Sequence, residues 1–207
     1  MHIHIQTTPE EIQRARRWFS GLDMLWQMAY NETLFGKGPT VEPPSDEHLM
    51  MLVLGLENLR FAGPSAPYPN MSFQLKDLSG LIPLRRLKHI TLCNHQVTSL
   101  AALSHHTALE HLFVMENQLS SLAGVEQLTN LRNLYCQGNQ ITTLSPIRNL
   151  TNLEVLYVTR NHLQDLDGLT RSHKAKLKTF RVIPNNALPD EAIIRCQQEL
   201  GILCKRG

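Results

Sequence analysis

The chain has 207 residues, of which 42% are hydrophobic and 18% charged, and its formal net charge is +2. This composition is typical of a folded protein and excludes a disordered chain. So small a charge does not by itself indicate a nucleic acid or a membrane surface as partner. Aromatic residues make up only 6% of the chain, so the places where they gather are informative.

Signals for export or membrane insertion are missing from the sequence. No run of about 18 apolar residues occurs, so no membrane span is expected. The first residues lack the basic-then-apolar order of a signal peptide, which favours the cytoplasm; an exported chain that has lost its signal is the alternative. The cysteines show no CxxC spacing, so we expect reduced thiols rather than a disulfide framework or a zinc site. They are Cys93, Cys136, Cys196 and Cys204.

The first 55 residues predict a helical cap. Thr8, Pro9 and Glu11 form the pattern of a helix start, with a capping threonine, a proline in the first turn and a reciprocal glutamate. The predicted helices span residues 9–19, 22–34 and 45–54. A cap is expected because a stack of repeats exposes an apolar end. The alternative is that the aromatic residues of this segment, Trp18, Phe19 and Trp26, bind a partner themselves.

A 22-residue period follows the cap. Its units begin at Leu87, Leu109, Leu131 and Leu153, and apolar residues recur at fixed positions within each unit. An asparagine holds the same place in three of them, as Asn117, Asn139 and Asn161, whereas His95 holds it in the first. Such a period has to be recognised before any single element is read, because it determines the whole fold.

These repeats resemble the 22-residue class of the leucine-rich repeat family, found in internalins and in some phosphatase regulatory subunits. The resemblance covers about residues 56–188, with incomplete units at both ends, a proline-rich insertion over 63–70 and one unit stretched to 24 residues. It implies an α/β solenoid, a right-handed superhelix with a concave parallel sheet of about six strands. It also suggests a small protein of bacterial type.

The spacing of apolar residues explains how one unit folds. Leu134 and Cys136 alternate as in a short strand, whereas Leu144, Ile147 and Leu150 recur every three residues as in a 3₁₀ turn. The asparagine lies at the corner, where its amide can bond to backbone groups that leave the sheet. We expect an asparagine ladder that ends at Asn185. Thr98, Ser120 and Thr142 are expected to cap the convex turns.

A helix beginning near Pro189 and ended by Gly201 is expected to close the last coil, with Cys196 in its core. The predicted organisation is therefore a helical cap over 1–55, about five to six repeats over 56–188, and a C-terminal capping helix and tail over 189–207.

Stacked strands place equivalent residues in columns on the concave face. The central column reads Arg60, Thr91, Phe113, Tyr135, Tyr157, Arg181, and gathers three of the few aromatic residues. The flanking columns read Asn58, His89, His111, Asn133, Val155, Thr179 and Ala62, Cys93, Met115, Gln137, Thr159, Ile183. Glu116 and Arg160 lie at the edge. Exposed aromatic residues beside methionine and glutamine are favoured at protein interfaces, although aromatics also suit any pleated surface.

Four other sites were considered. Cys93 lies too far from His89 and His111 for a nucleophile–base pair. His89 and His111 are neighbours, but zinc needs a third ligand, which that column lacks; His2 and His4 form an equally weak pair. His95 either senses pH or simply replaces asparagine. Two basic clusters could meet an acidic partner or phosphate, or could merely be solvated. They comprise Arg171, His173, Lys174, Lys176 and Lys178, and Arg85, Arg86 and Lys88.

The sequence therefore predicts a non-catalytic module that binds a protein or peptide. It contains no phosphate-binding loop, nucleophile elbow or metalloprotease motif, and we expect no cofactor, nucleic acid or obligatory small molecule. The predicted partner-binding residues are Arg60, His89, Thr91, His111, Phe113, Met115, Tyr135, Gln137, Tyr157, Thr159 and Arg181. A regulatory subunit or effector with a second site on the helical cap is the alternative, and an enzyme or a metal-dependent sensor is disfavoured.

Overall fold

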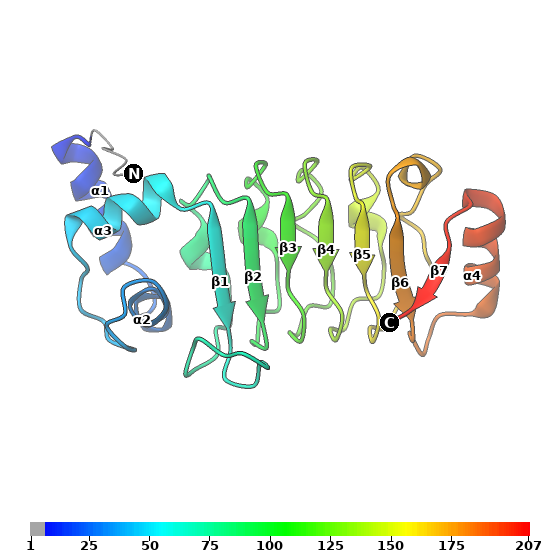
Figure 1. The fold of residues 1–207 in the computed structure, drawn as a ribbon, viewed down its shortest axis with the longest axis horizontal. Helices are drawn as coiled ribbons and strands as arrows, with labels where there is room; N and C mark the ends of the chain where they lie inside the picture. Colours follow the sequence, from blue (N-terminus) through cyan, green and yellow to red (C-terminus); the bar gives the residue numbers. More distant parts are fainter. Residues whose placement is uncertain (1–6) are drawn as a thin grey trace.

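Seven strands lie side by side in chain order in the computed structural model, which describes residues 7–207 (Figure 1). Every neighbouring pair is parallel, and the register advances by whole repeats, so that Leu112 pairs with Leu134 and Leu134 with Leu156. The strands are β1 (Asn58–Ala62), β2 (His89–Cys93), β3 (His111–Phe113), β4 (Asn133–Tyr135), β5 (Val155–Tyr157), β6 (Thr179–Ile183) and β7 (Cys204–Arg206). The predicted repeat solenoid is confirmed.

The prediction of about six strands is wrong by one. The tail after the last helix returns to the sheet as β7, where Cys204 pairs with Phe180 and Lys205 with Arg181. Cys204 is buried, whereas Leu203 before it is exposed. Three residues are too few to show an alternating pattern in the sequence, so the strand becomes visible only from its contacts with β6.

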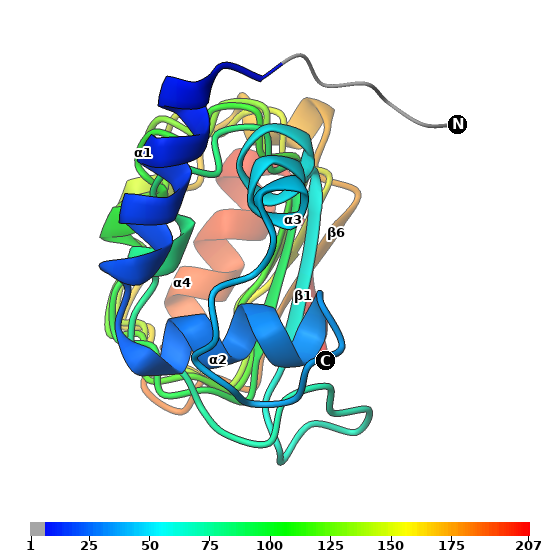
Figure 2. The same ribbon diagram turned by 90° about the vertical axis from the view of Figure 1, so that its left-hand side faces the viewer.

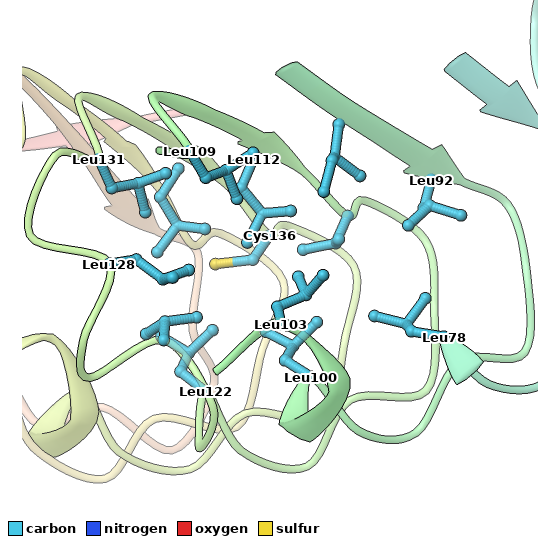
Figure 3. Close-up of a cluster of buried hydrophobic side chains, with 14 of the residues drawn as sticks. Leu78, Leu92, Leu100, Leu103, Leu109, Leu112, Leu122, Leu128, Leu131 and Cys136 are labelled. Carbon is cyan, nitrogen blue, oxygen red and sulfur yellow. The ribbon is translucent and has the colours of Figure 1, made fainter. Parts of the chain in front are cut away.

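The core lies between the sheet and the turns on its other side. Leu109, Leu112 and Leu131 point inward from the strand side and meet Leu100, Leu103 and Leu122 from the turns (Figure 3). These side chains are fully buried. No single coil could enclose its own leucines, so burial depends on the neighbouring coils, as expected for a linear stack.

The corner asparagines form the expected ladder. The Nδ2 group of Asn139 donates to the carbonyls of Val114 at 2.9 Å and Cys136 at 3.0 Å, and its Oδ1 accepts from the amide of Leu119 at 3.0 Å. Asn117, Asn161 and Asn185 repeat this arrangement. Each amide thus joins two coils and satisfies backbone groups that have left the sheet.

The predicted caps of the convex turns are displaced by one residue. Ser99, Ser121 and Thr143, rather than Thr98, Ser120 and Thr142, accept the amide two residues further on. Asp77 and Asp165 do the same in the first and last turns. The error arose because both neighbours are polar, and only the position that accepts the turn amide can cap it.

Three helices cover the open end of the sheet at β1 (Figures 1 and 2). They are α1 (Pro9–Ser20), α2 (Met24–Thr33) and α3 (Asp46–Met50). The capping box is confirmed, since the Thr8 side chain accepts the Glu11 amide and Glu11 accepts the Thr8 amide. The third helix is shorter than the predicted 45–54, because after Met50 the chain widens into a π turn over Met51–Gly55.

Aromatic side chains fasten this cap to the first coil. Trp26 and Tyr30 are buried; the Trp26 Nε1 donates to Asp77 at 3.1 Å and the Tyr30 hydroxyl to the carbonyl of Gly80 at 2.8 Å. Both rings pack on Phe61 of β1, with centroids 5.7 and 5.8 Å away. Phe19 is buried as well. The alternative in which these aromatics bind a partner is therefore wrong for Phe19 and Trp26.

At the other end α4 (Asp190–Arg195) and the π turn that follows it, Cys196–Leu200, close the last coil (Figure 1). Gly201 ends this segment with φ of 65°, a left-handed conformation suited to glycine. Cys196 is buried as expected. The core is continuous from Ala15 to Cys204, so both caps share it with the repeats, and the three-part division of the chain remains a prediction.

Two irregular segments interrupt the repeat. The insertion 63–70 folds back on β1, where the Asn70 side chain bonds to the amide of Ala62 and the carbonyl of Arg60. It extends beyond the strands at the bottom of Figure 2. The stretched unit places its extra residues in the turn around Gly168. Within residues 7–207, no helix combines the length and apolar character needed to cross a membrane.

Candidate binding face of the sheet

The face of the sheet that points away from the core carries the predicted columns. The strand register aligns Arg60, Thr91, Phe113, Tyr135, Tyr157 and Arg181 across β1 to β6, and adds Lys205 from β7. We call this surface, with its two flanking columns, the sheet face. Side chains on it alternate with buried residues along each strand, as in the pattern half-buried, buried, half-buried of β3, β4 and β5.

A continuous ladder of stacked side chains runs across this face. The Phe113 and Tyr135 ring centroids are 4.8 Å apart, and those of Tyr135 and Tyr157 are 4.3 Å apart. The Arg181 guanidinium lies over the Tyr157 ring at 5.1 Å. At the other end His89 stacks on Phe113 at 5.9 Å and on His111 at 4.0 Å. We call these six side chains the stacked ladder.

Stacking determines which part of each ring solvent can reach. Interplanar angles of 7° to 43° place ring faces against neighbouring rings, so mainly the edges and polar tips remain open. Burial and the adjacent Tyr157 raise the pKa of the Tyr135 hydroxyl, which therefore stays protonated. A partner would meet hydroxyl donors and ring edges rather than open aromatic faces.

Most predicted site residues lie on this face, with one exception. Arg60 is exposed, and the other residues named for the site are half-buried apart from Thr159. Thr159 is only 7% exposed, because Gly207 of the returning tail lies against it. Its assignment to an exposed site is therefore corrected. The cause is β7, which the sequence pattern did not reveal.

The insertion covers another part of the face. Ala62, Ala66 and Cys93 form a small buried cluster against Met115. Burial raises the pKa of the Cys93 thiol, which makes it a poor nucleophile and agrees with the rejection of a Cys93–histidine pair. Tyr68, at the outer part of the insertion, is 82% exposed, and its carbonyl accepts a hydrogen bond from the Arg60 guanidinium.

The histidine pair is bound into a polar column. The Nδ1 atom of His111 and the Nδ2 group of Asn133 are 2.8 Å apart, and the His89 ring stacks on the other side. Burial, then the neighbouring His89, lowers the pKa of His111, so the ring is neutral at pH 7. Among the described residues, no group of three or more histidine, cysteine or acidic side chains is placed to hold a metal ion.

Alternating charges border the sheet face where the strands begin. The equivalent positions hold Glu57, Lys88, Glu110, Arg132, Glu154 and Lys178. Lys88 reaches Glu57 at 2.9 Å, Lys178 reaches Glu154 at 2.7 Å, and Arg132 lies 3.4 Å from Glu154. These pairs are exposed, so each contributes little to stability, but together they neutralise this border.

A second border lies where the strands end. Asn94, Glu116, Gly138 and Arg160 occupy equivalent positions and all have positive φ, between 52° and 69°. Arg160 bonds to Glu116 across the intervening Gly138. A Cβ on Gly138 would lie 2.4 Å from the Glu116 carboxylate, so glycine leaves the room for this pair.

His95 replaces the asparagine of its coil. Its Nδ1 accepts the amide of Leu75 at 3.1 Å, as an asparagine oxygen would, and its Nε2 is buried without a hydrogen-bond partner. Burial lowers the pKa of His95 to about 4 despite the nearby Phe61 carbonyl. The side chain is therefore a neutral substitute for asparagine whose protonation would disturb the ladder.

Two further buried histidines were missed in the sequence. His106 and His173 occupy the convex slot that holds Leu84, Leu128 and Leu150 in other coils. Their Nε2 atoms lie 2.9 and 3.2 Å from the carbonyls of Leu81 and Ile147 in the preceding coil. Burial lowers the pKa of both. Aligning the repeats at this slot would have revealed them.

The basic clusters are largely engaged within the chain. His173 is buried and does not belong to an exposed basic run. Arg171 donates to the carbonyl of Glu199, Lys176 to Asn152, and Lys178 pairs with Glu154. Near the start of the repeats, Arg86 and Lys88 share Glu57. This arrangement favours the interpretation of solvated, locally paired charges.

Comparison with known proteins supports the repeat assignment. A family model described as leucine-rich repeats (2 copies) matches residues 107–149 and again residues 129–171. No match is found among curated proteins.

Several solved structures share the fold. An internalin (inlF) from Listeria monocytogenes is 19% identical with a TM-score of 0.56, covering 87% of this chain and 53% of its own. Internalin C2 (inlC2) from the same species is 19% identical with a TM-score of 0.56, covering 89% and 92%. The leucine-rich repeat ectodomain of the receptor kinase SOBIR1 from Arabidopsis thaliana is 24% identical with a TM-score of 0.51, covering 63% and 71%. The chain thus spans about half of the inlF chain, and these likenesses concern the fold alone.

Proposed function

We propose that this chain, whose repeats and fold are those of leucine-rich repeat proteins, is a non-catalytic module that binds a protein or peptide on its sheet face. Leucine-rich repeat proteins generally bind other proteins, which supports a protein partner. The observation that carries the proposal is the stacked ladder, which stays half-buried and open to solvent across five strands.

Physical reasons favour this surface over the rest of the molecule. Tyrosine and arginine are frequent anchors of protein interfaces. The ladder's rings support one another, so a partner would not have to immobilise them, which reduces the entropic cost of binding. Both borders consist of paired charges, which suits the polar rim of an interface.

The remaining parts of the proposal rest on sequence features. We place the protein in the cytoplasm because its cysteines are sparse and the first residues lack a signal pattern. We assign a protein rather than a nucleic acid because the ring faces are already stacked on one another and cannot receive bases.

A second site on the helical cap remains the alternative. Met51 is 50% exposed and lines a groove of about 500 Å³ together with Leu54 and Leu56. The groove lies beside Asn58, at the start of β1. An exposed methionine in an apolar groove is a common adaptable contact.

Affinity capture from extracts of the source cells tests the proposal. The Tyr135→Ala/Tyr157→Ala variant should lose a protein that the wild type retains. A Gln127→Ala/Arg148→Ala variant, altered at exposed positions on the turn side, should retain it and serves as the control. If the tyrosine variant keeps the protein and Met51→Glu loses it, the cap alternative replaces the proposal.

A further inference from the structure

The charges of the sheet face are of one sign. In the described sheet, the three columns contain Arg60, Arg181 and Lys205 and no aspartate or glutamate. Arg60 comes from β1, whereas Arg181 and Lys205 come from β6 and β7. The cations therefore lie towards both ends of the stacked ladder.

The carboxylates closest to this face are engaged by basic neighbours. On one border Glu57 and Glu154 pair with Lys88 and Lys178 at 2.9 and 2.7 Å. On the other, Glu116 pairs with Arg160. The borders are thus close to neutral, and the field over the middle of the face is set by the cations at its two ends.

Both arginines are held in place with donors to spare. The Arg60 guanidinium donates to the carbonyl of Tyr68, and Arg181 donates from Nη1 to the carbonyl of Arg206 while resting on Tyr157. Each guanidinium has five N–H donors in a fixed plane. The printed bonds use only some of them, and a carboxylate is the acceptor that this plane fits best.

The middle of the face also favours negative groups. Because the rings stack, they present their edges, and the edge of an aromatic ring carries partial positive charge. The Tyr135 hydroxyl remains a protonated donor. Carboxylates and backbone carbonyls would therefore be attracted along the whole ladder, whereas a cation would find few open ring faces.

The separation of the two arginines sets the length of the ligand. Arg60 and Arg181 are five strand spacings apart, which is about 24 Å at the usual spacing of parallel strands. An extended peptide covers that distance in about seven residues.

We propose that the partner presents an extended acidic segment of about eight residues, which lies across the strands with carboxylates at Arg60 and at Arg181. This inference rests on the proposed function, since it specifies the chemistry of a ligand for the same face. Single-stranded nucleic acid is also anionic, but the stacked rings offer no open platform for its bases.

The test is a selection from a random library of 12-residue peptides displayed on phage. Wild type and Tyr135→Ala/Tyr157→Ala serve as baits, after circular dichroism has shown that both are folded. Peptides retained by the wild type and lost by the variant should be richer in aspartate and glutamate than the starting library. A conservative Tyr135→Phe/Tyr157→Phe bait keeps the ring stack and controls for misfolding.

The selected peptide is then titrated by fluorescence anisotropy. Arg60→Gln/Arg181→Gln should weaken binding about fivefold or more, since each exposed charge pair contributes a fraction of a tenfold change. Arg14→Gln/Arg148→Gln removes the same charge at exposed positions outside the columns and should change affinity less than about twofold, as expected for a surface charge far from the contact. A 12-nucleotide oligothymidine should fail to compete.

The outcomes separate the two proposals. Ladder-dependent peptides that are neutral or basic would overturn the acidic segment and leave the sheet face as the binding surface. Effective competition by oligothymidine would also overturn it, in favour of nucleic acid. If no retained peptide depends on the tyrosines, both proposals fail.

Discussion

The rings of Tyr135 and Tyr157 lie with their centroids 4.3 Å apart, although 22 residues separate them in the chain. Each belongs to a separate strand, and the parallel register brings the two to equivalent positions. One repeat period thus converts a sequence spacing into a contact. The same register aligns the core leucines, the corner asparagines and the charges at the borders, so the fold and the proposed site depend on it together.

Asn139→Ala should lower the free energy of unfolding by about 2–4 kcal/mol. The change removes two donated bonds and one accepted bond, and it leaves the carbonyl of Cys136 and the amide of Leu119 without this partner in a buried corner. Urea denaturation at pH 7 measures the loss. Gln140→Ala, at the exposed neighbouring position, should change stability by less than about 0.5 kcal/mol. Equal effects at the two positions would show that the ladder is dispensable.

Gly80→Ala should loosen the contact between the cap and the first coil. An added Cβ would lie 2.3 Å from the Trp26 ring, which is fully buried and cannot move aside freely. We expect a loss of about 2 kcal/mol or more and a red-shifted tryptophan emission. Lys76→Ala, at an exposed nearby position, is the control. An unchanged emission spectrum and stability would contradict the close packing of Trp26 on the first coil.

Acid should destabilise the protein through its buried histidines. The folded-state pKa of His95 is lowered from 6.5 to about 4, so the unfolded chain binds the proton more readily between these values. Stability is therefore fully present above pH 6.5 and falls as the pH drops towards 4, by about 2 kcal/mol at pH 5 from this residue. His106 and His173 act in the same direction.

The His95→Asn variant isolates this contribution. Asparagine restores the side chain found at the same corner in the following coils and removes the titrating group. Chemical denaturation at pH 7.5 and pH 5 should show a smaller stability difference for His95→Asn than for the wild type. An identical difference in both proteins would mean that His95 does not titrate in this range.

The Glu116–Arg160 pair should contribute little to stability. Both side chains are well exposed, so a double-mutant cycle with Glu116→Ala and Arg160→Ala should give a coupling of about 0.5 kcal/mol that disappears in 1 M salt. A coupling that exceeds about 2 kcal/mol and persists in salt would instead assign this border a structural role.

Much of this architecture follows from the sequence because it is local and periodic. The strand positions of Phe113, Tyr135 and Tyr157 are set by the repeat, and the asparagine corner recurs with it. The capping box at Thr8 and the helix end at Gly201 depend on a few neighbouring residues, so they too are legible in the chain.

The errors arise where contacts are not periodic. Thr159 is covered by Gly207, and Cys93 by the insertion, and nothing in the repeat pattern indicates either contact. The strand β7 lies outside the 22-residue period. His106 and His173 are a different case, since they occupy a leucine slot whose occupants can be aligned in the sequence. Attention to the asparagine slot alone left them out.

The most direct test of the central claim is the dissociation constant of a captured partner, measured by calorimetry. Two anchor tyrosines at an interface centre are expected to contribute about 2 kcal/mol each, so Tyr135→Ala/Tyr157→Ala should weaken binding by about 100-fold or more, with Gln127→Ala/Arg148→Ala unchanged. A tyrosine variant that binds within about twofold of the wild type would contradict the claim that the sheet face is where the partner binds.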